Sequence, residues 1–211
     1  IIDQVAVKGD SALISFEKKF NGVALSNLLV SKKEIKDAYK SVTKDQIDAI
    51  IEAKNRLTKT ESALKKQLTK IRVVSNDTKI TKSFEPISNV GCYVPGGLAR
   101  YPSSAVMSIV PAKLAGVQKI IVVTPPDKQG KIDPLVLVAA DICGANMIFK
   151  VGGAHAIAAL AIGTKSIPSV DKIVGPGGSF VTTAKYLMTN TTSIDMLAGP
   201  TEDRKSTRLN S

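Results

Sequence analysis

Residues 147–163 carry the pattern that decides the fold, and they read Met-Ile-Phe-Lys-Val-Gly-Gly-Ala-His-Ala-Ile-Ala-Ala-Leu-Ala-Ile-Gly. The β-prone run Met147–Val151 predicts a short buried strand, and the Ala-rich run Ala154–Ile162 predicts an apolar helix. Gly152-Gly153 lies between them, where a tight turn favours residues without a side chain. The stretch is therefore one unit of strand, glycine turn and helix.

The same unit recurs along residues 89–200. We expect further strands and helices, in chain order, at Gly91–Val94, Ser103–Ala115, Lys119–Thr124, Pro134–Ile142, Lys172–Val174 and Ser179–Met188. Gly116, Gly144 and Gly163 each follow a predicted helix, where a left-handed residue commonly ends it. Alternating buried strands and helices predict the α/β class, with a Rossmann-like, mostly parallel sheet and helices on both faces. We assign this fold to residues 89–202.

Residues 1–88 form a predicted N-terminal helical segment that ends in a β-hairpin. An amphipathic stretch at Ile2–Phe20 is interrupted by Gly9. Two capping boxes then mark helix starts, Ser31 with Glu34 and Thr43 with Gln46, because hydroxyl and acidic or amide side chains exchange bonds with free amides there. Apolar residues at helical spacing extend the second helix to about Gln67. Alternating β-prone residues over Ile71–Ile87 predict the hairpin.

The composition is that of a soluble globular protein, with 211 residues, 44% of them hydrophobic, and a net charge of +11. No apolar run approaches the roughly 20 residues that cross a bilayer. The lysines are mixed with acidic residues, and no aromatic platform alternates with them, so we expect no nucleic-acid binding. The start Ile1-Ile2-Asp3 lacks both an initiator Met and a signal peptide, and it indicates a fragment boundary and a cytoplasmic protein.

Metal binding and nucleophilic catalysis are not predicted for this chain. Its only histidine is His155, and Cys92 and Cys143 have neither metal-ligand spacing nor disulfide density. No serine or cysteine has a histidine partner apparent at the same strand end, which a nucleophile with a base requires. We therefore assign no catalytic and no metal-ligating residue.

Three glycine turns lie where ligands bind to parallel sheets, at the carboxyl ends of strands. They are Tyr93-Val94-Pro95-Gly96-Gly97, Val151-Gly152-Gly153-Ala154-His155 and Gly175-Pro176-Gly177-Gly178-Ser179. Each precedes a helix, so its amides and the positive helix end are placed to meet a phosphate or a carboxylate. None matches the common dinucleotide or P-loop motifs, and tight turns alone would explain any one of them.

Four segments closely resemble the histidinol dehydrogenase family in order and spacing. They are Gly91 with Tyr93–Gly97, Val151–Leu160, Asp171–Gly177 and Ile194–Pro200. The resemblance implies an enzyme that oxidises L-histidinol to L-histidine through an aldehyde, in two NAD-dependent steps that end histidine biosynthesis. It also implies a homodimer with one zinc per site.

The resemblance assigns roles to four residues. Tyr93 matches a tyrosine that contacts NAD, and a half-buried ring with a hydroxyl suits that role. His155 stands where the family commonly has a glutamine that touches the cofactor, and Gly178 where it has an asparagine; a histidine bonding locally at a helix start is an equal alternative for His155. Thr201 matches a serine or threonine near the substrate. The family's zinc ligands and its acid-base Glu and His lie farther along than this chain.

The last nine residues, 203–211, depart from the family pattern. They carry three basic residues and no apolar period, which is typical of translated vector sequence, so we treat them as a non-native tail. The chain then carries the cofactor-binding part of the enzyme and should not turn over histidinol alone. The alternatives are a non-catalytic nucleotide- or anion-binding domain and, from its lysines, a basic nucleic-acid-binding protein.

Overall fold

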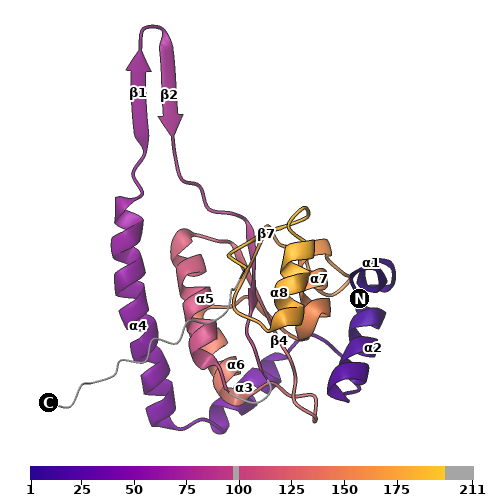
Figure 1. Cartoon of the computed structure of the whole chain (residues 1–211). Coiled ribbons are helices and arrows are strands. Elements are labelled where there is room, and N and C mark those ends of the chain that lie inside the picture. Colours follow the sequence, from indigo (N-terminus) through magenta and orange to yellow (C-terminus); the bar gives the residue numbers. More distant parts are fainter. Residues whose placement is uncertain (97–99, 198–211) are drawn as a thin grey trace, which may run out of the picture.

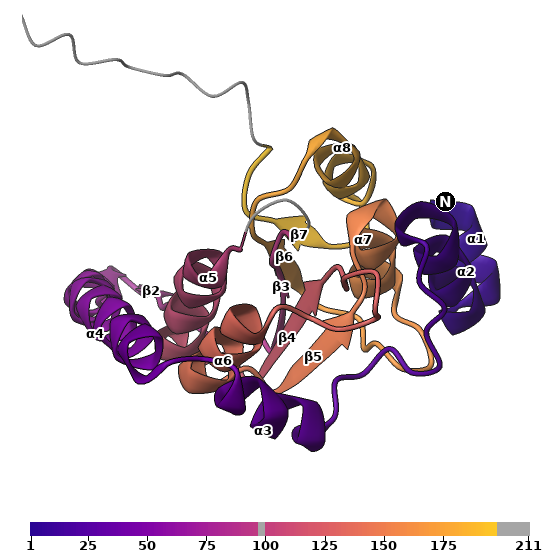
Figure 2. The same ribbon diagram turned by 90° about the horizontal axis from the view of Figure 1, so that it is seen from below.

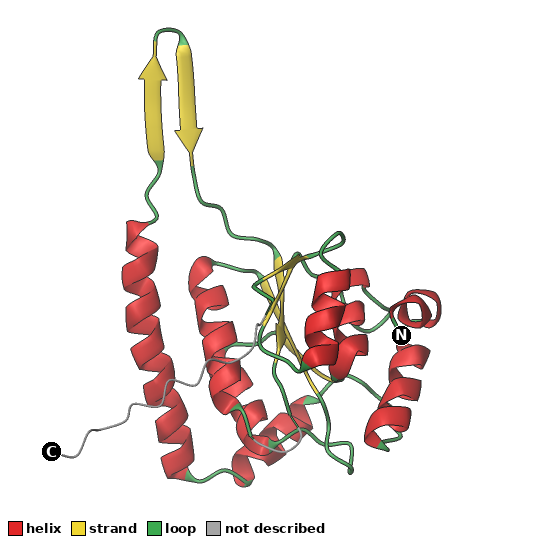
Figure 3. Ribbon diagram, in the orientation of Figure 1, coloured by secondary structure: helices red, strands yellow, loops and turns green. Residues whose placement is uncertain are grey.

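The computed structural model describes residues 1–96 and 100–197, and its centre is a five-stranded parallel sheet (Figure 3). The strand order is β5-β4-β3-β6-β7. The strands are β3 (Asn89–Tyr93), β4 (Lys119–Thr124), β5 (Met147–Lys150), β6 (Lys172–Val174) and β7 (Ser193–Ile194). Each pairs in parallel with its neighbours. The predicted α/β fold class is confirmed.

Helices cover both faces of this sheet (Figure 2). They are α5 (Pro102–Ala115) and α6 (Pro134–Cys143) on one face, and α7 (Gly153–Ile162) and α8 (Ser179–Leu187) on the other. Side chains of a strand alternate between the faces. Accordingly, Ile121 and Val123 of β4 pack in one hydrophobic core, while Ile120 and Val122 pack in the other.

Residues 1–88 contribute to both cores. Helices α1 (Ile2–Lys8) and α2 (Asp10–Asn21) lie beside α7, whereas α3 (Lys32–Lys40) and α4 (Lys44–Gln67) lie beside α6 and α5 (Figures 1 and 2). Buried residues of the first pair join the core under α7, and those of the second pair join the opposite core. The N-terminal helices are thus packed onto the sheet layers, and a boundary at residue 88 stays a prediction.

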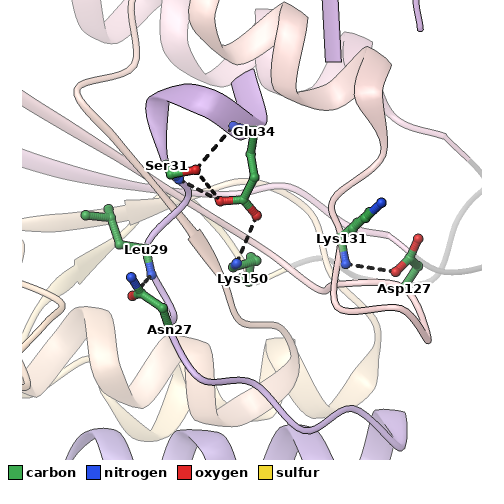
Figure 4. Close-up of polar contacts among 7 residues, drawn as sticks. All are labelled: Asn27, Leu29, Ser31, Glu34, Asp127, Lys131 and Lys150. Atoms are coloured by element: carbon green, nitrogen blue, oxygen red, sulfur yellow. Dashed lines mark hydrogen bonds and ion pairs between the residues drawn. The ribbon is translucent and has the colours of Figure 1, made fainter. Parts of the chain in front are cut away.

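Both predicted capping boxes are confirmed. The Ser31 hydroxyl accepts a bond from the Glu34 amide at 3.2 Å, and the Glu34 carboxylate accepts one from the Ser31 amide at 2.8 Å. Thr43 and Gln46 make the same reciprocal pair. The Lys150 ammonium also donates to the Glu34 carboxylate, at 3.0 Å. Figure 4 shows this contact. This ion pair ties the start of α3 to the end of β5.

The outer edge of β5 is covered by the segment that precedes α3. The Val30 amide donates to the Ile148 carbonyl at 2.8 Å, and the Lys150 amide donates to the Leu28 carbonyl at 2.7 Å. Leu29 and Phe149 form an antiparallel bridge between these two bonds. Backbone groups that an edge strand would expose are therefore paired there.

The predicted hairpin is confirmed as β1 (Ile71–Ser75) and β2 (Thr78–Lys82), which project away from the sheet and its helices (Figure 1). Every residue of both strands is exposed. The alternation that predicted the strands therefore buries neither face within the described part of the chain.

Two details differ from the sequence-based expectation. Gly116 and Gly144 end their helices in the left-handed conformation, but Gly163 combines a φ of 83° with an extended ψ of 154°, so the left-handed prediction was wrong there. Strand β7 was not predicted, because two residues give no periodicity. Within residues 1–96 and 100–197, no helix has both the length and the apolar character that crossing a bilayer requires.

Candidate functional site

The order in which the chain adds strands to the sheet reverses at β3. From β3 the chain builds β4 and β5 on one side, and it then crosses back to build β6 and β7 on the other. In open α/β sheets, ligands bind outside the carboxyl ends of the strands near such a switch point. The three glycine turns follow β3, β5 and β6, so all of them lie at this edge.

A cavity of about 400 Å³ opens beside these turns. It is lined by Ile1, Phe20, Asn21, Tyr93, Gly96, Pro125, Pro126, Gly153, Ala154, His155 and Phe180. The lining combines residues at or just after the ends of β3, β4 and β5 with Ile1 and residues of α2 and α8. Its size and its mixture of rings with a few polar groups are typical of small-molecule sites.

Tyr93 joins the first glycine turn to the second. The residue is only 5% exposed, and its hydroxyl oxygen accepts a bond from the Gly153 amide at 3.1 Å. Burial raises the pKa of this phenol. The hydroxyl therefore keeps its proton, and because its oxygen serves the Gly153 amide, that proton stays free to be donated to a ligand.

The turn after β5 is held by a carboxylate that sequence reasoning missed. Glu17 of α2 is fully buried, at 0% exposure. Its Oε1 accepts a bond from the Gly152 amide at 2.8 Å and lies 2.9 Å from Nε2 of His155, while Oε2 accepts from the Asn21 amide at 2.5 Å. A signal was present: Glu17 lies one helical turn after buried Leu13, on the apolar face of α2.

This arrangement corrects the expectation that all three turns offer free amides to an anion. The Gly152 amide is bound by Glu17, and the Gly153 amide is bound by Tyr93. The carboxylate already occupies the positive N-terminal end of α7, where a negative group is stabilised. The amides of Gly152 and Gly153 are therefore not available to a phosphate.

His155 lines the cavity although it is only 2% exposed. Its ring packs against Phe16 and Phe20, with centroids 5.5 and 6.1 Å away. Its ring nitrogen Nε2 is hydrogen-bonded to Glu17, which is 138 residues away in sequence. The alternative of a histidine bonding locally at its helix start is therefore wrong.

The turn after β6 is held by Lys185 and Asp195, which follow it in the chain. Gly175 has a φ of 110°, and its amide donates to Oδ2 of Asp195 at 2.8 Å. The ammonium of Lys185, a residue 4% exposed on α8, donates to the Gly175 carbonyl and to Oδ1 of Asp195, both at 2.6 Å. An ion pair between buried Lys185 and partly exposed Asp195 thus engages both the backbone N–H and the backbone C=O of Gly175.

Gly178 lies at the N-cap of α8, and no side chain caps this helix. The amides of Gly177, Gly178 and Ser179 have no hydrogen-bond partner among the described residues. A Cβ placed on Gly178 would meet nothing within 4 Å. Gly178 is not among the residues that line the cavity, although Phe180, two residues later, is one of them.

A second cavity, of about 380 Å³, adjoins the first at Gly96, Pro125 and Pro126. Its far wall carries the Arg100 guanidinium, which lies 3.2 Å from the Asp133 carboxylate. The loops after β3 and β4 therefore border two adjacent cavities.

A family model of histidinol dehydrogenase matches residues 1–203, nearly the whole chain. The chain belongs to the histidinol dehydrogenase family. The histidinol dehydrogenase of Clostridium acetobutylicum is 49% identical over 204 residues, and that of Methanocaldococcus jannaschii is 45% identical over 202 residues. Each match covers 96% of this chain and 47% of the relative. The chain therefore spans about half the length of these relatives.

A solved structure agrees with the fold. The crystal structure of histidinol dehydrogenase from Elizabethkingia anophelis superposes with a TM-score of 0.89 at 37% identity, covering 94% of this chain and 46% of that one. The strand order and the three glycine turns thus belong to a histidinol dehydrogenase scaffold.

Zinc, which the histidinol dehydrogenase family implies, does not fit the described residues. No three His, Cys, Asp or Glu side chains of this part lie close enough to hold a metal ion. The chain has one histidine, and Nε2 of His155 is engaged by Glu17. Burial raises the pKa of the Cys92 thiol to about 12 and that of the Cys143 thiol to about 11, which disfavours thiolate ligands.

Of the four residues predicted for the site, the structure brings Tyr93 and His155 to one cavity. Gly178 lies on the neighbouring turn, at the start of α8. Thr201, the predicted substrate residue, lies outside the described residues. Their roles stay predictions.

Proposed function

We propose that this chain supplies the NAD-binding part of an enzyme that oxidises L-histidinol to L-histidine through histidinaldehyde. Membership of the histidinol dehydrogenase family supports the reaction class. The observation that carries the cofactor role is the cavity at the carboxyl edge of the sheet, which aromatic residues including Tyr93 line. NAD, when bound, would accept the hydride.

The cavity suits a flat heteroaromatic ring. Phe20, Tyr93, His155 and Phe180 approach it from four different elements, and aromatic rings stack on such ligands. The Tyr93 hydroxyl offers a proton to a carboxamide or ribose oxygen. Tyr93, with its partner Gly153, would therefore bind and orient the cofactor, and the surrounding apolar rings would exclude water.

Substrate chemistry would need residues outside this chain. In the complete enzyme, zinc would orient the substrate and a Glu and His pair would move protons, as the family resemblance implies. We propose that the complete enzyme is a cytoplasmic homodimer acting on L-histidinol, and that residues 1–211 alone bind NAD without turning over histidinol.

Calorimetric titration of the chain with NAD tests the cofactor role. Tyr93→Phe removes the hydroxyl but keeps the ring, so we expect NAD to bind about threefold to tenfold more weakly, as for the loss of one net hydrogen bond. Tyr186→Phe is the matched control, because Tyr186 is exposed on the outer part of α8. Equal affinities for both variants would contradict a role for Tyr93.

The reaction class is tested with the complete reading frame that contains this sequence. In a bacterium that lacks histidinol dehydrogenase, we expect it to restore growth on histidinol without histidine. The alternative is a non-catalytic nucleotide-binding domain, which the glycine turns would also support. NAD binding by the chain without complementation by the complete frame would favour that alternative.

A further inference from the structure

The buried carboxylate of Glu17 connects an N-terminal helix to the wall of the cavity. Glu17 lies on α2, and its partners Gly152 and His155 lie at the start of α7, more than 130 residues later. Phe16 and Phe20, from the same helix, pack against the His155 ring. Three residues of α2 therefore contact His155, the histidine that stands where the family commonly has a glutamine.

The hydrogen bonds of Glu17 define which ring nitrogen carries the proton. The Gly152 amide can only donate, and it donates to the same Oε1 that faces Nε2 of His155. The side-chain amide of Asn21 donates to the other oxygen, Oε2. The N-terminus of α7 also favours a negative charge on Glu17. Because both other partners donate to Glu17, we assign its carboxylate as the acceptor and Nε2 of His155 as the donor.

The other ring nitrogen, Nδ1, has no protein partner among the described residues. Every buried side-chain nitrogen and oxygen in that part of the chain has a hydrogen-bond partner. Within the described part of the chain Nδ1 is therefore not fully buried, and the space beside the ring is the cavity that His155 lines. In a neutral ring whose proton is on Nε2, Nδ1 is an acceptor.

We propose that Glu17 is a positioning residue, which holds His155 protonated on Nε2 and thereby presents Nδ1 to the cavity as an acceptor for an N–H or O–H donor of the dinucleotide. This assignment rests on the proposed NAD-binding function. A glutamine at this position would both donate and accept. The histidine, held in this way, only accepts, so the site selects a donor group such as a carboxamide N–H at this point.

The free chain tests the first half of the proposal. Because His155 is the only histidine of the 211 residues, long-range ¹H–¹⁵N spectra of the imidazole need no assignment. At about pH 8, where an ordinary imidazole is neutral, we expect a protonated Nε2 and an unprotonated Nδ1. Glu17→Gln should shift the ring towards a mixture of the two tautomers. A proton on Nδ1, alone or with one on Nε2, would overturn the proposal.

Titration with NAD tests the second half. We expect the Nδ1 resonance to move on binding more than the Nε2 resonance, and Glu17→Gln to bind NAD about fivefold more weakly. Glu52→Gln, the same change on the exposed surface of α4, should leave the affinity unchanged. In the His155→Ala background, Glu17→Gln should cause no further loss. An equal loss in both backgrounds would show a merely structural role.

Failure of the two proposals is distinguishable. If the folded wild-type chain does not bind NAD, the proposed function of the chain fails, and the tautomer of the free chain still decides whether Glu17 sets the His155 ring. If NAD binds but the Nδ1 resonance stays fixed and Glu17→Gln is silent, the cofactor role stands and this inference is overturned.

Discussion

The turns after β5 and after β6 look alike in the sequence but differ in the structure. In the turn after β5, Glu17 and Tyr93 bind the amides of Gly152 and Gly153. In the turn after β6, Asp195 and Lys185 hold only the first residue, and the three amides of residues 177–179 have no partner among the described residues. The two glycine amides of the first turn are thus occupied, whereas three consecutive amides of the second remain available to a ligand.

This difference shows that a glycine turn before a helix is not in itself an anion site. What decides is whether the protein's own acceptors already use the amides. Here the deciding group, Glu17, comes from a helix more than 130 residues earlier in the chain. Substitutions that remove or exchange these groups should therefore affect the two turns differently.

The largest effect is expected from Gly175→Ala. A Cβ at this position would lie 2.1 Å from the Tyr93 carbonyl oxygen, and the φ of 110° is strained for any residue with a side chain. Because the obstacle is backbone of the central strand β3, we expect a loss of more than about 4 kcal/mol in the free energy of unfolding. Urea unfolding followed by circular dichroism measures it.

Gly178→Ala is the matched control on the same turn. Its Cβ would meet nothing within 4 Å, and Gly178 has an ordinary φ of −68°. We expect a change of less than about 0.5 kcal/mol. Similar losses for both variants would mean that the turn after β6 is not anchored at Gly175.

A second prediction concerns Glu17, which binds the first amide of the turn after β5. Glu17→Ala leaves the Gly152 amide and His155 without their acceptor in a fully buried position. Each buried donor that loses its acceptor costs about 1 to 3 kcal/mol, so we expect a loss of about 3 kcal/mol for Glu17→Ala, whereas Glu17→Gln retains an acceptor and should cost less. Urea midpoints of the two variants test this order, and an unchanged midpoint for Glu17→Ala would show that water replaces the carboxylate.

The ion pair at the turn after β6 predicts an effect of pH. Burial raises the pKa of the Asp195 carboxyl, but the bonds from Lys185 and from the Gly175 and Met196 amides lower it more, so its pKa is below the ordinary 3.8. A depressed pKa stabilises the fold above the unfolded pKa, and this contribution is lost as the pH falls from about 4 through the folded pKa.

Asp195→Asn should therefore lower the urea midpoint at pH 7, and the difference from wild type should shrink between about pH 4 and 3. Asp48→Asn, on the exposed side of α4, is the control for removing one carboxylate. A difference that stays constant down to pH 3 would contradict a stabilising charge on Asp195.

Local sequence patterns were sufficient for most of the fold. Strand β4 begins and ends where its apolar run predicts, and α4 begins and ends between its capping box and Gln67, because both signals lie within the element itself. Only part of the candidate site could be predicted from the sequence. Tyr93 and His155 came from the family resemblance, and no local pattern indicated that α2 would lie against them.

The residues that were missed share a signature. Glu17 and Lys185 each lie one helical turn from a buried apolar residue, Leu13 and Val181, and are themselves buried. A charge on an apolar helical face must find a partner, because an unpaired buried charge is costly. Periodicity thus flags such residues, but it cannot name a partner that is distant in sequence.

The smallest effect is expected from Gly178→Asn, which restores the residue common in the family. The open space at Gly178 accepts the side chain, and an asparagine at an N-cap binds one of the free amides of α8. Because glycine is itself an acceptable N-cap, the gain in unfolding free energy should be only a few tenths of a kcal/mol. Because the asparagine oxygen accepts from an amide of α8, its NH2 group is left to donate, and we expect NAD to bind about threefold more tightly, as for one new hydrogen bond. The same change in the turn after β5, Gly152→Asn, should instead destabilise the fold, since its Cβ would lie 2.5 Å from Pro125. Weaker NAD binding by Gly178→Asn would mean that the free amides, rather than an added side chain, are what the dinucleotide uses at this turn.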